Sequence, residues 1–170
     1  MEYLILALLV VMPALTIIAG LKDLTTMTIP NWISVGIIAG FFPAAFAVGL
    51  PWTTMLVHVG VAFAALLIGM GMFALRWLGG GDAKLMAATT LWLGLSGSLH
   101  FIFWTALVGG VFGLFLMLAR RRVQPFMAGA PAWLVRLMEP KGDIPYGVAI
   151  AAGALIAYPA SPMVVAFLAR

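Results

Sequence analysis

Long apolar runs, interrupted by short connectors that contain polar residues, glycine or proline, occupy most of the chain. Between residues 3 and 21 there is no charged side chain, and an apolar run of this length can cross a bilayer as one α-helix. Five more apolar segments follow along the chain. Together the segments predict membrane-spanning helices at about residues 3–21, 30–50, 52–75, 82–93, 99–119 and 144–169.

The fourth predicted helix is short, because the Gly-Leu-Ser-Gly-Ser sequence at residues 94–98 predicts a turn directly after it. A helix needs ~20 residues to cross a bilayer alone, so we expect its first residues to lie slightly below the headgroup level. Gly36 with Gly40, and Gly109 with Gly113, have the small-xxx-small spacing that lets membrane helices pack closely.

The one long connector, residues 123–142, lies between the fifth and sixth predicted helices. Within it, residues 131–139 have the pattern of a short amphipathic helix, whose apolar side chains are expected to lie on the membrane surface. These side chains are Trp133, Leu134, Leu137 and Met138.

The composition strengthens the membrane interpretation. Of the 170 residues, 65% are hydrophobic and only 8% are charged, whereas soluble domains carry roughly a quarter charged residues. Backbone groups inside a bilayer must be satisfied internally, and unbroken apolar runs favour helices over an alternating barrel pattern. We therefore predict an all-α integral membrane protein with a single domain, residues 1–170. The absence of cysteine excludes disulfides, thiolate metal sites and cysteine nucleophiles.

The charge distribution predicts an orientation. In a six-helix arrangement, eight of the nine basic residues fall on one side, and only Arg170 falls on the other. The eight are Lys22, Arg76, Lys84, Arg120, Arg121, Arg122, Arg136 and Lys141. The positive-inside rule makes this side cytoplasmic and places both termini outside. A single long helix over residues 85–119 would remove the bias, so we favour six. The basic residues form no stripe of the kind that binds nucleic acid.

The same orientation brings Asp23 and Asp82 to the cytoplasmic face. A carboxylate at the edge of a membrane helix is costly to place, and such residues are usually functional. Two carboxylates that share one proton can hydrolyse a peptide bond, because the ionised one activates water while the protonated one polarises the carbonyl. The three glycines at residues 79–81 remove side-chain bulk beside Asp82, so that an extended substrate can approach. We predict that Asp23 and Asp82 form a catalytic pair; which is acid and which is base stays open.

A resemblance supports this pair. Gly79-Gly80-Gly81-Asp82 matches the G-x-G-D pattern of intramembrane-type aspartic proteases. Residues 82–85 (Asp-Ala-Lys-Leu), with Lys22-Asp23 and residues 29–31 (Ile-Pro-Asn) upstream, resemble a prepilin peptidase. Residues 144–147 (Ile-Pro-Tyr-Gly) are similar to the last characteristic segment of that family. The resemblance implies that Asp23 and Asp82 are catalytic, that no metal or cofactor is needed, and that the leaders of type IV prepilins are removed at the cytoplasmic face of the bacterial inner membrane.

The departures from the family pattern indicate a subtype. Larger prepilin peptidases carry an N-terminal cytoplasmic segment, often with zinc-binding cysteine pairs, and also N-methylate the new terminus. This sequence has neither such a segment nor any cysteine. It therefore resembles the short peptidases of tight-adherence (Flp-type) pilus systems, and we expect no methyltransferase activity. The expected partners are precursors with a basic leader and a hydrophobic helix, together with the lipid bilayer; the oligomeric state stays open.

Further residues are candidates for binding substrate or shaping the site. Besides Gly79, Gly80 and Gly81, they are Lys84, Pro145, Tyr146 and Gly147. Lys84 lies two residues past Asp82 and therefore on another helix face, which favours an interfacial anchor. Tyr146 has the default role of an interfacial tyrosine, and Asp143 is expected to serve the start of the last helix.

Three other functions are less consistent with the sequence. An ion- or proton-coupled transporter would use the edge aspartates but needs polar groups in mid-span, where the sequence is nearly all apolar. A non-catalytic pilus assembly scaffold is disfavoured by the presence of both aspartates. Residues 94–97 match the G-x-S-G of rhomboid-type serine proteases, yet His58 precedes the serine and His100 follows it by only four residues. A turn is the better interpretation, with both histidines near the outer interface.

Overall fold

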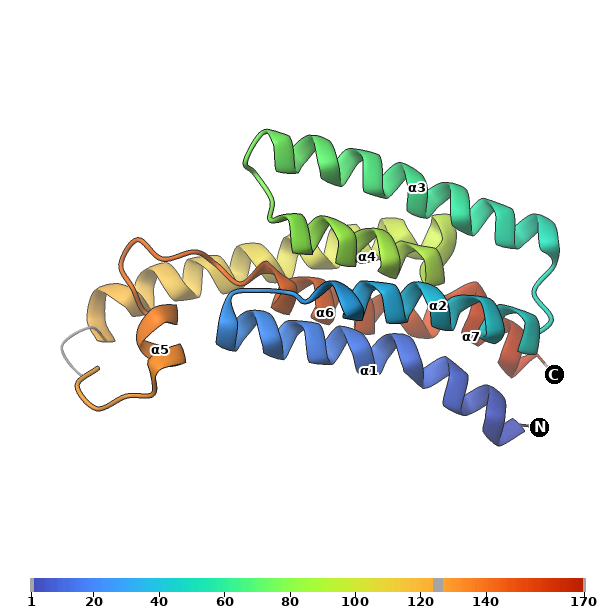
Figure 1. The fold of residues 1–170 in the computed structure, drawn as a ribbon, viewed down its shortest axis with the longest axis horizontal. Coiled ribbons are helices and arrows are strands. Elements are labelled where there is room, and N and C mark those ends of the chain that lie inside the picture. Colours follow the sequence, from blue (N-terminus) through green and yellow to red (C-terminus); the bar gives the residue numbers. More distant parts are fainter. Residues whose placement is uncertain (1, 124–126, 170) are drawn as a thin grey trace.

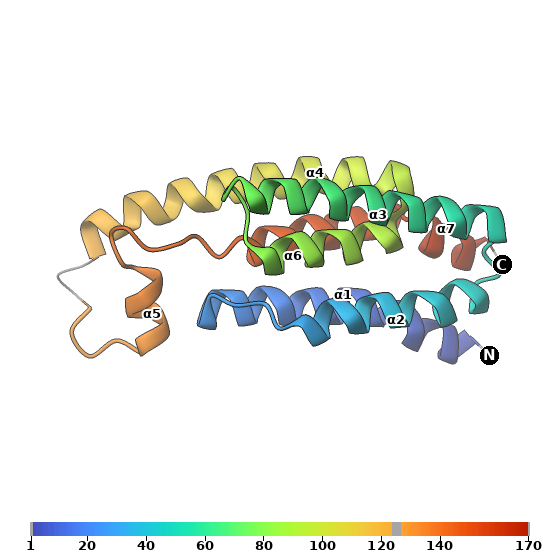
Figure 2. The ribbon, with the colours of Figure 1, turned by 45° about the horizontal axis from the view of Figure 1, so that its top comes forward.

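The computed structural model describes residues 2–123 and 127–169, and every regular element in this part of the chain is helical. The elements are α1 (Glu2–Thr26), α2 (Asn31–Ala47), α3 (Trp52–Ala74), α4 (Gly80–Val123), α5 (Ala132–Leu137), α6 (Tyr146–Ala157), η2 (Tyr158–Ala160) and α7 (Pro162–Leu168). Four helical stretches are long and apolar enough to cross a membrane: Glu2–Thr26, Trp52–Ala74, Gly80–Val123 and Tyr146–Leu168. The all-helical, membrane-type prediction is thereby confirmed. The start of α1 and the end of α7 lie at the same end of the bundle (Figures 1 and 2).

Helix α4 reverses direction at Gly94, so that residues 80–93 and 95–123 lie side by side in both ribbon views (Figures 1 and 2). The predicted five-residue turn at residues 94–98 is wrong in its extent, because the helix resumes directly after Gly94. Gly94 makes the reversal alone, with φ 64° and ψ −170°. A residue with a Cβ is strained at this positive φ, whereas glycine adopts it readily.

The Gly94→Ala variant is expected to unfold at a lower temperature than the wild type. The extended backbone with positive φ at this position costs a residue with a Cβ about 1 to 3 kcal/mol, and the new methyl group would lie 2.7 Å from Nε2 of His58. Thermal unfolding in detergent would measure the loss. Gly110→Ala is the matched control on the same helix, since its Cβ would meet open space; an equal loss in both variants would contradict the special role of Gly94.

The first and last predicted spans have different bounds from those expected. α1 continues to Thr26, so Asp23 lies within the helix and not in a connector. The helix ends where Met27 takes a positive φ of 54°. The last span, predicted as one helix over residues 144–169, begins at Tyr146 and is interrupted by η2. Pro159 lies inside η2, where its missing N–H and its ring prevent a continuous α-helix.

The packing of the bundle uses the predicted glycine pairs. A Cβ on Gly40 would lie 2.7 Å from Val11 of α1, and one on Gly36 would lie 3.0 Å from Leu15 of the same helix. A Cβ on Gly109, in the second half of α4, would lie 3.1 Å from the phenol group of Tyr146. Trp92 is fully buried at the centre and donates a hydrogen bond from its ring N–H to a backbone carbonyl of α2, at 2.8 Å. Glycines therefore let α1 approach α2, and α4 approach α6.

The predicted amphipathic segment forms α5, which lies beside the far end of α4 (Figures 1 and 2). Two of its apolar residues do not lie on a membrane surface as expected. Leu137 and Met138 are buried in a small cluster with Leu116 of α4, and Leu24 and Met27 at the end of α1 pack against that cluster. Burial against protein replaces burial in lipid, because α4 extends past the other helices and provides an apolar partner.

Candidate functional site

Asp23 lies near the C-terminal end of α1 and is 7% exposed. Its Oδ2 accepts a hydrogen bond of 2.7 Å from the backbone N–H of Gly147. Gly147 belongs to the first turn of α6, where backbone N–H groups have no partner within the helix and stabilise negative charge. This hydrogen bond joins α1 to α6, and both of its residues are among the site residues predicted from the sequence.

Asp82 lies in the first turn of α4, three residues after Gly79. The carbonyl of Gly79 accepts the first helical hydrogen bond, from the N–H of Ala83 at 3.1 Å. The Asp82 carboxylate accepts a hydrogen bond from the Gly79 backbone in return. This second contact is one half of a capping box, in which the side chain at the third helical position caps the backbone N–H of the residue before the helix, and it favours a helix that begins here. The other oxygen, Oδ1, is buried and has no hydrogen-bond partner among the described residues.

The two carboxylates line one open cavity of about 920 Å³. They are close enough to interact electrostatically. The cavity lies where α1 and α3 end and where α4 and α6 begin, which is the same end of the bundle (Figure 1). Its other lining residues are Met27, Phe73, Ala74, Arg76, Trp77, Leu78, Gly79, Gly142, Asp143, Ile144, Pro145 and Tyr146. A cavity of this size is within the usual range of ligand-binding pockets.

Glycines surround the carboxylates because there is no room for side chains. A Cβ on Gly79 would lie 2.7 Å from Oδ2 of Asp82, and one on Gly147 would lie 2.9 Å from Oδ2 of Asp23. Gly81 is similarly close to Ile29, at 3.1 Å, while Gly80 would only touch Phe73, at 3.4 Å. A side chain therefore does not fit at Gly79 or at Gly147, and the approach of an extended substrate past the glycines of residues 79–81 stays a prediction.

The remaining predicted site residues divide into two groups. Pro145 and Tyr146 line the cavity, and Asp143 is an exposed residue on its rim. Lys84 is exposed, is not among the residues that line the cavity, and donates a hydrogen bond of 2.9 Å to Oδ1 of Asn31. This contact ties the start of α4 to the start of α2, and the role of Lys84 as an interfacial anchor stays a prediction.

Several residues of the cavity wall have no recognisable signal in the sequence. Phe73, Arg76 and Trp77 come from the end of α3 and the connector behind it. Arg76 has a positive φ of 60°, which is unusual for a residue with a side chain and marks the sharp turn there. An Arg-Trp pair after an apolar run predicts an interfacial anchor, and nothing in the pattern shows that the following connector turns toward the aspartates.

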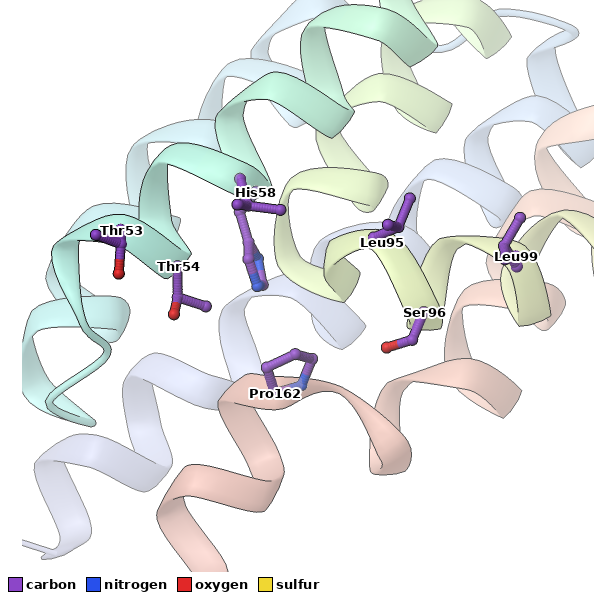
Figure 3. Close-up of a pocket in the computed structure, with 8 residues that line it drawn as sticks. Thr53, Thr54, His58, Leu95, Ser96, Leu99 and Pro162 are labelled. Atoms are coloured by element: carbon purple, nitrogen blue, oxygen red, sulfur yellow. The ribbon is translucent and has the colours of Figure 1, made fainter.

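A second cavity, of about 530 Å³, lies at the other end of the bundle, where α3 begins (Figure 3). It contains the serine–histidine combination considered above, since His58 and Ser96 both line it. His58 is buried, and its Nδ1–H donates to the carbonyl of Leu91 at 2.7 Å. His100 is exposed and contacts the backbone carbonyl of Ser96 at 3.1 Å. No hydrogen bond between the Ser96 hydroxyl and either ring occurs among the described residues, and His58 instead satisfies a carbonyl near the reversal at Gly94.

Among the described residues, no group of three or more histidine or acidic side chains is placed to hold a metal ion.

Comparison with known proteins agrees with the motif pattern. The model of the type IV leader peptidase family matches residues 10–114, which include Asp23 and Asp82. The segment at residues 144–147 lies outside the match. Searches of the curated proteins and of the solved structures found no significant match.

Proposed function

Because the chain belongs to the type IV leader peptidase family, we propose that it removes the leaders of Flp-type prepilins with Asp23 and Asp82 as an aspartic catalytic pair. The observation that carries the proposal is the shared cavity: two carboxylates from helices distant in sequence line one opening and interact electrostatically. The family supports a peptidase of type IV prepilins, and the glycine contacts around both carboxylates support these two residues as its chemistry.

The pair would hold one proton between its two carboxyl groups. The ionised carboxylate takes a proton from water, and the resulting hydroxide adds to the scissile carbonyl carbon. The protonated carboxyl donates its hydrogen to the carbonyl oxygen. When the tetrahedral intermediate collapses, the C–N bond breaks and the proton first taken from water passes to the leaving amine. The carboxylate that had donated its hydrogen takes a proton back from a hydroxyl of the intermediate, so that the pair again holds one proton. The hydrogen bond from Gly147 holds Asp23 in place during these steps.

The substrate would enter from the membrane side. The cavity lies at the end of the bundle where the basic residues gather, including Lys22, Arg76 and Arg120. With six crossings, counting the two halves of α4 separately, the positive-inside rule places this end in the cytoplasm and both termini outside. The hydrophobic helix of the precursor then lies beside the bundle in the inner membrane, and the junction with its basic leader reaches the aspartates.

The test is processing of a co-expressed Flp-type prepilin in a host without its own prepilin peptidase. We expect a mature pilin whose intact mass lacks the leader, and no added methyl group on the new N-terminus. A precursor that keeps its full mass while the peptidase is present in the membrane would overturn the proposal. Ion flux through the purified protein in liposomes, lost in Asp82→Asn, would favour the transporter instead.

A further inference from the structure

Arg120 is the one arginine of the Arg120-Arg121-Arg122 run that is buried. It is 5% exposed, whereas Arg121 and Arg122 are exposed. Burial of a charged side chain is costly unless its hydrogen-bonding groups are satisfied. The position of Arg120 near the end of α4 therefore requires specific contacts, and the structure shows three.

The guanidinium donates hydrogen bonds to three backbone carbonyls in three directions. Nε contacts Leu137 at 2.9 Å, Nη1 contacts Gly142 at 2.7 Å, and Nη2 contacts Asp143 at 2.7 Å. Leu137 is the last residue of α5, whose terminal carbonyls lack partners within the helix and favour a cation. None of these three bonds goes to a carboxylate. One side chain thus joins the end of α4 to both ends of the connector after α5.

This connector forms a wall of the aspartate cavity. Gly142, Asp143, Ile144 and Pro145 all line the cavity and lead directly into α6. Two residues after Pro145, the N–H of Gly147 reaches Asp23. In Figures 1 and 2 the connector runs from α5, alongside the extended end of α4, back to the start of α6. The position of the connector therefore affects the position of the first turn of α6 relative to Asp23.

We propose that Arg120 is a positioning residue of the leader-cleavage site, which holds the connector at residues 142–145 so that α6 presents its N–H to Asp23. The inference rests on the proposed function above. Arg120 touches neither carboxylate, and it acts through the backbone that it binds. Arginine is required because its planar fork donates in three fixed directions, whereas lysine offers one compact charge that cannot reach the three carbonyls together.

The experiment compares Arg120→Lys and Arg120→Gln with Arg121→Lys and Arg121→Gln, which make the same changes at an exposed neighbour. Purified enzyme in liposomes would cleave a prepilin, with kcat and KM measured separately. We expect kcat to fall about 10- to 100-fold in both Arg120 variants with a smaller change in KM, since slight misplacement of catalytic groups has effects of this size. Both Arg121 variants should stay within about twofold of the wild type, as surface substitutions usually do.

A second measurement follows the connector directly and does not depend on activity. Because the chain has no cysteine, Lys141→Cys provides a single site for a spin label, on an exposed residue next to Gly142. The label is expected to become more mobile when Arg120 is lysine and to stay unchanged when Arg121 is lysine. This spectrum remains informative even if Arg120→Gln does not fold.

The outcomes separate the two proposals. If the wild type cleaves prepilin and the Arg120 variants match it in kcat and in label mobility, the role of Arg120 is wrong and the peptidase function stands. If the wild type does not cleave while the label still loosens in Arg120→Lys, the connector contact is real and the proposed function is wrong. If Arg120→Lys keeps the wild-type kcat while Arg120→Gln loses it, a positive charge alone is sufficient, and the requirement for the planar guanidinium of arginine is wrong.

Discussion

Replacing Asp82 with asparagine is expected to abolish leader cleavage, and Asp23→Asn is expected to do the same. Asparagine keeps the size of the side chain but can neither carry the shared proton nor take one from water. The loss of kcat should reach at least about 10³-fold, in the range found when a group essential to a catalytic unit is removed. The double variant should be no worse than either single variant, because residues that act as one unit are strongly non-additive. The measurement is the rate of prepilin processing in liposomes.

Asp143→Asn is the matched control for both variants. It removes a third carboxylate from the same cavity, yet its side chain is exposed on the rim and its backbone carbonyl contact to Arg120 is unaffected by the change. Cleavage in this variant should stay within a few-fold of the wild type, in keeping with an exposed substitution. If Asp143→Asn abolished cleavage while Asp23→Asn did not, the pair would have to be reassigned to Asp82 and Asp143.

The sequence was informative about the helices and the aspartates for a simple physical reason. Apolar run length reports membrane helices directly, and a carboxylate next to a glycine cluster stands out against an apolar background. The helix ends were harder to predict. The apolar run ends at Leu21, and Lys22-Asp23 marks the end of the first predicted span, yet α1 continues to Thr26. Similarly, Gly94 alone makes a reversal for which the pattern predicted five residues.

The pattern of apolar and polar residues does not predict which distant segments come into contact. Arg120 belongs to three consecutive arginines, and the sequence does not show which of them turns inward toward the connector. Leu137 and Met138 have the pattern of a membrane-surface helix, which is also the pattern of a helix packed on protein. Gly147 was predicted from the family resemblance, but its close approach to Asp23 depends on how α6 packs against α1.

Gly147→Ala is expected to lower kcat about 10²-fold while the protein still folds. The new methyl group would lie 2.9 Å from both Cβ and Oδ2 of Asp23 and 3.0 Å from Ile29. Contacts under 3.0 Å cannot be kept, so Asp23 or the first turn of α6 must move. Either movement breaks the 2.7 Å hydrogen bond between them. Displacement of a catalytic group by about 1 Å is sufficient for a loss of this size. The measurement is kcat and KM for prepilin cleavage in liposomes.

Gly36→Ala separates this effect from ordinary overpacking. Its Cβ would lie 3.0 Å from Leu15, again between two helices, but the contacted atom is the flexible end of a leucine and no carboxylate is near. We expect Gly36→Ala to change thermal unfolding about as much as Gly147→Ala and to leave kcat within about twofold, because the α1–α2 contact can relax without moving Asp23. Equal losses of kcat in the two variants would mean that kcat depends on tight helix packing in general and not on the contact at Asp23. A loss confined to Gly147→Ala would show that the close approach of α6 to Asp23 is what the glycine provides.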